Sequence, residues 1–187
     1  MSAVGTLPMA GRSAYVHYRP GETVSHTRPG DIILVRNKQW LGLFVRAFIR
    51  MRYRAPEDRP YAYWTHAVLV ATDAGHLVEV NGRGVIISHV REYRDCHYHY
   101  VSLDLPDAGR KAAVQFARSC LKQRYSLCNL LLLGASIALG DRIRVPDGGH
   151  GCVSLVARAL QQAGIHFDRR PTDMTPADLA RRFGVRP

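Results

Sequence analysis

The sequence has few cysteines, and their spacing argues against two common kinds of small scaffold. It contains four of them in 187 residues: Cys96, Cys120, Cys128 and Cys152. No two form a Cys-x-x-Cys pair, and none has the spacing of a zinc finger. A chain of this length with so few cysteines is not expected to depend on a disulfide framework.

Long apolar segments are also lacking. The longest run, Leu130 to Leu139, is interrupted by Gly134 and Ser136, and it is too short to cross a bilayer as a helix. The segment from Met1 to Pro20 has no continuous apolar core of the kind that a secretory signal needs. We therefore expect a cytoplasmic protein, unless a dedicated export route recognises another signal.

Lysine is scarce, although the chain is strongly basic. Lys38, Lys111 and Lys122 are the only lysines, so arginine supplies nearly all of the formal net charge of +11. Such a field attracts anionic partners, which include nucleic acid, acidic lipid headgroups and acidic cell-wall polymers. An interpretation of equal weight is that the charge reflects a genome biased toward arginine codons and lies on a solvated surface without a specific partner.

The order of sequence patterns predicts one α+β domain. Residues 1–28 are rich in Gly, Pro and Ser and are predicted to form an irregular N-terminal arm, and residues 29–187 form the domain. Strands are predicted at Ile32–Val35, at Thr65–Val70 and His76–Val80 as a hairpin, and then at Val85–Val90 and Tyr98–Leu103. Because the strands precede most of the helices without βαβ alternation, we expect an antiparallel sheet packed against helices.

Helical periodicity marks the remaining elements. Trp40 to Arg54 is amphipathic and basic; its apolar stripe is predicted to face the core, and contact of Leu41–Arg54 with a membrane surface is the alternative. Further helices are predicted from Ala108 to near Tyr125, as a buried segment over Leu130–Leu139, from Cys152 to Gly164, and after the N-cap Thr175.

Cys152 is the candidate nucleophile. It follows the glycine-rich loop 146–151 and occupies the first turn of a predicted helix. The free N–H groups and the positive end of the helix dipole at such a position stabilise a thiolate and can donate to an oxyanion. Cys120, which lies in the middle of a predicted helix on its apolar face, is interpreted instead as a buried structural cysteine.

His66 is the candidate base, and Glu79 the candidate acid that orients it. His66 stands at the start of an apolar strand, and Glu79 is the only acidic residue in the strand that returns. A four-residue turn, Thr72 to Gly75, would place both side chains on one face of the hairpin. A three-residue turn would place them on opposite faces. His150, two residues before Cys152, is a rival base.

These motifs in this order resemble the permuted branch of the NlpC-type papain-like cysteine hydrolases, which includes YiiX-like proteins and is similar to lecithin retinol acyltransferase. The resemblance extends from Pro29 to Phe183 and rests on four segments: Pro29–Leu34, Thr65–Val70 with Glu79, Gly151–Val156, and Thr175–Leu179. It implies a circularly permuted papain-like fold in which the histidine precedes the cysteine. Tyr125 matches a tyrosine common in that family.

By this resemblance Cys152 is the nucleophile, His66 the general base and Glu79 the orienting residue, with Gly151, His150 and Tyr125 lining the substrate or oxyanion loop. The implied reaction is acyl transfer through a thioester on an amide or ester, with no cofactor and no metal. An amidase or peptidase acting on a cell-wall or peptide-like substrate is the main expectation. A lipid acyltransferase or acyl hydrolase at an anionic membrane is the alternative.

Two rival functions remain less favoured. Cys96, His97 and His99, with His89 nearby in sequence, contain a His-x-His pair that zinc could bind, but no fourth ligand has a conventional spacing. A basic nucleic-acid-binding module would use the arginines, but these are scattered and form no recognisable motif.

Overall fold

The computed structural model describes residues 13–36, 49–50, 52–53, 55–82, 84–123 and 151–187. Its centre is a six-stranded sheet in the order β1-β6-β2-β3-β4-β5, in which every neighbouring pair is antiparallel. The strands are β1 (Ser13–Tyr18), β2 (Ile32–Arg36), β3 (His66–Val70), β4 (His76–Asn81), β5 (Gly84–His89) and β6 (His97–Leu103). The predicted α+β class with an antiparallel sheet is confirmed.

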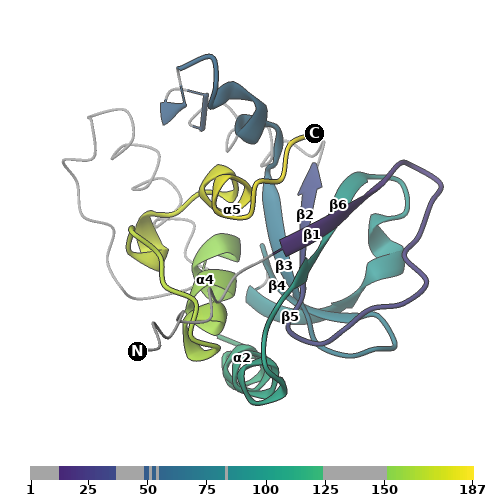
Figure 1. The fold of residues 1–187 in the computed structure, drawn as a ribbon. Helices are drawn as coiled ribbons and strands as arrows, with labels where there is room; N and C mark the ends of the chain where they lie inside the picture. The colour runs from purple at the N-terminus through teal and green to yellow at the C-terminus, as the bar shows by residue number, and fades with distance from the viewer. Residues whose placement is uncertain (1–12, 37–48, 51, 54, 83, 124–150) are drawn as a thin grey trace, which may run out of the picture.

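The helices α2 (Asp107–Ser119), α4 (Cys152–Gln162) and α5 (Pro176–Arg182) lie on one side of this sheet (Figure 1). α4 is amphipathic, and its buried face, which includes Leu155, Val156 and Leu160, packs against β3 and β4. Short 3-10 helices complete the described chain: η1 (Arg59–Tyr63), η2 (Val90–Tyr93) and η3 (Pro171–Asp173). The main core therefore lies between the helices and one face of the sheet.

The β3–β4 hairpin has the longer of the two turns considered from the sequence. Leu69 pairs with Val78 and Val70 with Leu77, and the backbone N–H of Ala71 donates to the carbonyl of His76. The turn is thus the four residues 72–75, and Glu79 projects from the same face as Val68 and His66. Gly75 has a φ of +87°, a conformation that favours glycine.

The first strand corrects the prediction of an irregular arm. Ser13–Tyr18 pairs along its whole length with β6, so this part of the arm belongs to the same sheet as the rest of the domain. β1 is an edge strand that is mostly exposed, and it lacks the buried apolar alternation by which strands are recognised. Residues 13–18 form a strand because they pair with β6, which is distant in sequence, and not because of their own sequence pattern.

A buried ion pair joins the start of β2 to α2. Nη1 of Arg110 lies 2.8 Å from Oδ1 of Asp31, and the hydroxyl of Tyr100 donates to Oδ2 at 2.6 Å. Arg110 also donates to the carbonyl of Pro29. The backbone of Gly30 lies close to the Arg110 side chain, since a Cβ added at Gly30 would be 3.1 Å from Cγ of Arg110. The Pro-Gly-Asp sequence before β2 is therefore an anchor for the helix layer.

α5 begins with the predicted N-cap. The backbone N–H and the hydroxyl of Thr175 both donate to Oδ2 of Asp178 at 2.7 Å, which is a capping box. Oδ1 of Asp178 accepts a hydrogen bond from the hydroxyl of Tyr53 at 2.5 Å. Together with the buried Ile49, this contact links α5 to the end of the predicted basic helix. The remainder of that helix, and the membrane contact considered for Leu41–Arg54, lie outside the described residues.

α2 ends earlier than predicted. It stops at Ser119, and Lys122 then adopts a positive φ of 66°. Backbone hydrogen bonds join Lys122 N–H to the carbonyl of Val85, and Val85 N–H to the carbonyl of Gln123. The chain leaves the helix because it pairs with the start of β5. The predicted segment Leu130–Leu139 lies outside the described residues.

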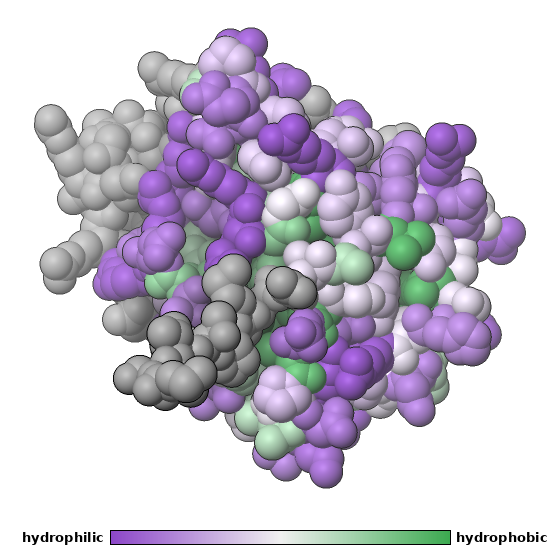
Figure 2. Space-filling model, in the orientation of Figure 1, coloured by the Kyte–Doolittle hydropathy of each residue, from purple (hydrophilic) through white to green (hydrophobic). Residues whose placement is uncertain are grey.

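The surface in the view of Figure 2 is mainly hydrophilic, with hydrophobic residues in small separate groups. Within the described ranges, the exposed large hydrophobic residues are Tyr15, Val16 and Ile87, and they lie on the edge strands β1 and β5. No helix among the residues placed by the structure combines the length and apolar character needed to span a membrane.

Candidate active site

Cys152 is the first residue of α4, as predicted. Gly151 is the N-cap, with φ and ψ of −90° and 165°. Its N–H donates to Oγ of the buried Ser154 at 2.7 Å, and that hydroxyl donates back to the carbonyl of Gly151 at 3.1 Å. Ser154 therefore holds Gly151 against the first turn of the helix. This contact fixes the backbone from which the Cys152 side chain extends.

His66 and Glu79 meet as the hairpin register requires. Nε2 of His66 lies 2.7 Å from Oε2 of Glu79, and the two side chains are only 14% and 7% exposed. The sequence predicted this contact for the four-residue turn, and the prediction is confirmed. A carboxylate at this place holds the Nε2–H of the ring and directs Nδ1 away from itself.

The ring of His66 also forms a hydrogen bond with Cys152. Because Nε2 is engaged by Glu79, the nitrogen left for the sulfur is Nδ1. Cys152 stands at a helix start and His66 at a strand start, and α4 packs directly against β3. The structure thus brings the three predicted residues into one continuous chain of contacts, Cys152–His66–Glu79.

The electrostatics of this chain favour an ion pair. Burial by itself would raise the pKa of Cys152, but the charge and hydrogen bond of His66, followed by the N–H groups of Ala67 and Val153, hold that pKa below its ordinary value. Burial would likewise lower the pKa of His66, but Cys152 and then Glu79 raise it. A thiolate beside an imidazolium is the state that these shifts favour.

Glu79 is kept ionised by its neighbours. Burial opposes its charge, but the hydrogen bond and charge of His66, followed by donors that include Tyr93, lower its pKa. The Tyr93 hydroxyl donates to Oε2 at 2.5 Å, the same oxygen that contacts His66. Burial and the adjacent Glu79 raise the pKa of Tyr93, so the phenol stays protonated and remains a donor.

Two residues of the site were not assigned a role from the sequence. Ser154 stands three residues after the N-cap Gly151, which is the spacing of a capping box, so its contact could have been anticipated. Tyr93 offers no comparable signal. It follows Glu79 by 14 residues and reaches it only through the path of β5 and η2.

Of the other predicted site residues, Gly151 is described by the structure, whereas His150 and Tyr125 are not. Gly151 lies where it was expected, directly before Cys152. His150 and Tyr125, which were assigned to the substrate or oxyanion loop, lie outside the described residues. Their roles stay predictions. The backbone N–H groups of Ala67 and Val153 form hydrogen bonds with the sulfur of Cys152, which lower its pKa.

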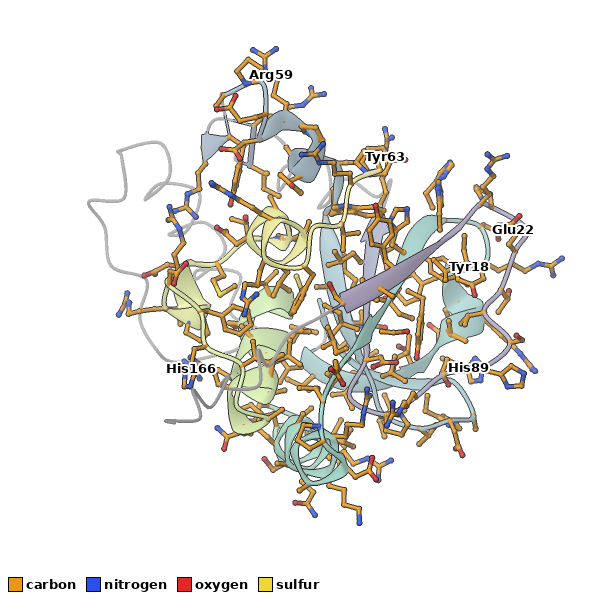
Figure 3. All side chains as sticks on the ribbon, viewed as in Figure 1. Tyr18, Glu22, Arg59, Tyr63, His89 and His166 are labelled. Carbon is orange, nitrogen blue, oxygen red and sulfur yellow. The ribbon has the colours of Figure 1, made fainter. Side chains whose placement is uncertain are left out.

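The alternative zinc site is not formed. Within the part of the chain that the structure describes, no group of three or more His, Cys, Asp or Glu side chains is arranged to hold a metal. His89, labelled in Figure 3, lies on the edge strand β5, and three strands separate it from β6 with His97 and His99. Its Nε2 contacts the carbonyl of Ala74 at 3.0 Å. Proximity in sequence was misleading, because β2, β3 and β4 lie between the strands that carry these histidines.

Comparisons with known proteins give no assignment. No protein-family model matches the sequence, and a search of curated proteins finds no similar chain. The geometry of the site and the resemblance of its motifs are therefore what indicate a function.

Proposed function

We propose that this chain is a thiol-dependent hydrolase or acyl transferase that acts on an amide or ester bond through a thioester on Cys152. One observation carries the proposal. Cys152 begins a helix and is hydrogen-bonded to His66, which is held in turn by the ionised Glu79. Nucleophile, base and orienting acid in this sequence of contacts are the arrangement of an activated cysteine.

We further propose that the domain is a circularly permuted papain-like fold of the NlpC type. Its support is the order of the parts: the strands with His66 and Glu79 precede the helix that begins with Cys152. The packing of α4 on β3 and β4 is also what such a fold requires. The resemblance of the four motif segments adds the expectation of amide or ester substrates.

The reaction follows from the groups present. His66 accepts the thiol proton, and the sulfur of Cys152 attacks the carbonyl carbon to form a C–S bond. The amine or alcohol leaves with the proton that His66 returns, and the acyl group stays on the sulfur. Water or another nucleophile then gives its proton to His66 and attacks the thioester, which releases the acyl group and restores the thiol.

Backbone N–H groups stabilise the negative charge that forms during the reaction. The negative charge that develops on the carbonyl oxygen forms beside the first turn of α4, where free N–H groups and the helix dipole lie. The N–H of Cys152 itself is the donor that we assign to the oxyanion. Glu79 stabilises the imidazolium while the charge is separated.

We propose an amidase or peptidase activity on a peptide-like or cell-wall substrate as the main activity. The resemblance to the NlpC-type hydrolases favours it, and the net charge of +11 suits an anionic fragment. The alternative, an acyl hydrolase or acyltransferase for lipid esters, rests on residues 41–54, most of which lie outside the described part of the chain.

The test is a panel of amide and ester substrates together with a thiol-directed activity probe, applied to the wild type and to Cys152→Ala. The variant should lose probe labelling and at least about a thousandfold of the turnover. Cys120→Ala is the matched control, since Cys120 is buried and burial raises its pKa. It should keep the labelling and the activity. A Cys152→Ala protein that still turns over any substrate of the panel at the wild-type rate would refute the proposal.

A further inference from the structure

We infer that Tyr93 is a positioning residue of this site, which acts through Glu79 to keep the Cys152–His66 pair ionised. The inference deepens the proposed function and rests on it. Its basis is that Tyr93 and His66 contact the same oxygen of Glu79. Oε2 accepts a hydrogen bond from the Tyr93 hydroxyl at 2.5 Å and lies 2.7 Å from Nε2 of His66.

A buried glutamate has rotamer freedom that a second donor can remove. His66 alone would hold Glu79 by one contact, about which the carboxylate could turn. With the Tyr93 hydroxyl on the same oxygen, from a different element, the direction of Oε2 is fixed by two donors. The rings of His66 and Tyr93 lie 6.2 Å apart between centroids, and both residues contact this oxygen. The carboxylate therefore presents one oxygen to the imidazole in one orientation.

Tyr93 can act in this way because its own element is anchored. η2 has a capping box in which Nδ1 of His89 accepts from the N–H of Arg91, and Oε1 of Glu92 accepts from the N–H of His89. Nε2 of His89 contacts the carbonyl of Ala74 in the β3–β4 turn at 3.0 Å. The short helix that carries Tyr93 is thus tied to the hairpin that carries Glu79.

The ring of Tyr93 belongs to a second apolar cluster, on the opposite face of the sheet from the helices. Tyr93 is 8% exposed and packs with buried side chains that include Val68, Val70 and Leu77. The ring therefore contributes packing, whereas the hydroxyl alone reaches the site. This division allows the two roles to be separated by removing only the oxygen.

The groups that act on the site come from several elements. Glu79 on β4 faces His66 from β3 and Tyr93 from η2, while Cys152 from α4 lies beyond the imidazole. Glu92, beside Tyr93 on η2, acts on the Tyr93 hydroxyl by its charge. Two neutral hydroxyls, those of Ser88 and Tyr93, lower the pKa of Glu79. Of these, the Tyr93 hydroxyl is the one that lies within hydrogen-bonding distance of Oε2.

The consequence concerns the position of a proton. Without the hydroxyl, the carboxylate is less well fixed and its charged form is less stabilised, so it supports the imidazolium less. The pair of Cys152 and His66 then shifts from thiolate and imidazolium toward thiol and neutral imidazole. The thiolate would form only at a higher pH, and the titration of His66 would move to a lower pH.

The test compares Tyr93→Phe with Tyr100→Phe. Tyr100 is a matched control, because it is also a buried tyrosine whose hydroxyl donates to a buried carboxylate, that of Asp31 at 2.6 Å. The rate of Cys152 alkylation by iodoacetamide is measured against pH by mass spectrometry. Tyr93→Phe should react about tenfold more slowly near neutral pH, with a midpoint about one pH unit higher, as loss of a hydrogen bond to a charged group predicts. Tyr100→Phe should keep the wild-type profile.

A second measurement separates this inference from the proposed function. The ring protons of His66 are followed by NMR across the same pH range in all three proteins. If Cys152 of the wild type reacts as an ordinary thiol, the proposed function fails, yet the His66 titration still reports on Tyr93. Movement of that titration to lower pH in Tyr93→Phe alone supports the positioning role. An unchanged titration, or an equal shift in Tyr100→Phe, overturns it.

Discussion

His66 and Glu79 are 13 residues apart in sequence, yet Nε2 of the one lies 2.7 Å from Oε2 of the other, because a four-residue turn joins their strands. A turn shorter by one residue would reverse the face of every side chain on β4. The contact is therefore a consequence of turn length, and the glycine at position 75 with its φ of +87° is part of what makes that turn. The candidate site depends on this local geometry as much as on the residues themselves.

Glu79→Gln should keep the fold and lower turnover by about 100-fold or more. The amide has the size of the carboxylate but no charge, so it cannot stabilise the imidazolium, and it can favour the wrong tautomer of His66. The measurement is kcat/KM on the best substrate of the panel, with Tm as the check on folding.

The control is Glu22→Gln, which alters an exposed carboxylate that accepts from the backbone of Arg19. It should leave kcat/KM unchanged. Equal activity of Glu79→Gln and the wild type would remove Glu79 from the proposed mechanism and would leave its contact with His66 as a structural one.

The pH dependence of Cys152 reactivity should show a plateau across neutral pH that vanishes in His66→Ala. His66 lowers the pKa of Cys152, so the thiolate exists once the pH rises above that lowered value. The pKa of His66 is raised, so the imidazolium persists until the pH rises through that raised value. Between the two limits the ion pair is the dominant form.

In His66→Ala the sulfur loses its partner and should titrate near or above the ordinary value of about 8.5. Iodoacetamide labelling of Cys152 should then be slow at neutral pH and should rise only in alkali. His150→Ala, at the rival histidine, should reduce activity without abolishing the plateau. The opposite ranking of the two variants, matched for Tm, would transfer the role of base to His150.

The sequence predicted the hairpin and the contact of His66 with Glu79 but not all that surrounds them. Alternation, turn residues and helix caps are local signals, and they located β2, β3, β4, α4 and α5. β1 was missed because it is exposed and becomes a strand through β6. Tyr93 was missed for a related reason: its contact with Glu79 depends on the tertiary path of β5 and η2, which no local pattern encodes.

Arg110→Met should destabilise the fold by about 3–5 kcal/mol. Arg110 and Asp31 are 6% and 2% exposed, so the variant would leave a buried carboxylate without its cation. Chemical denaturation would measure the loss in the free energy of unfolding. The exposed pair of Arg28 and Asp107, at 3.4 Å, is the control, and Arg28→Met should have little effect.

The double variant Asp31→Asn with Arg110→Met tests the cause. If the cost is that of an uncompensated charge, the double variant should be more stable than Arg110→Met alone. A double variant that is less stable than either single one would show that Arg110 acts mainly through its hydrogen bonds to the carbonyls of Pro29, Leu103 and Leu105.

His99 should make the fold sensitive to acid, independently of the candidate site. Its ring is buried between Tyr15 and Trp64, with centroid distances of 5.1 and 4.5 Å, and in the described part of the chain neither ring nitrogen has a hydrogen-bond partner. Burial, followed by the charges of His17 and His97, lowers its pKa to about 4.

The sign of the effect follows from this shift. Between pH of about 6.5 and about 4, the unfolded chain binds a proton at His99 that the folded chain does not. Stability should therefore fall as the pH is lowered through this range and should level off below it, with a total loss at this residue of at most about 3 kcal/mol.

His99→Phe, which keeps an aromatic ring and removes the titrating nitrogens, should flatten that part of the stability profile. His166→Gln, at an exposed histidine, should leave the profile as it is in the wild type. Denaturant midpoints measured across this pH range decide the matter, and a His99→Phe profile as steep as that of the wild type would assign the acid sensitivity to other groups.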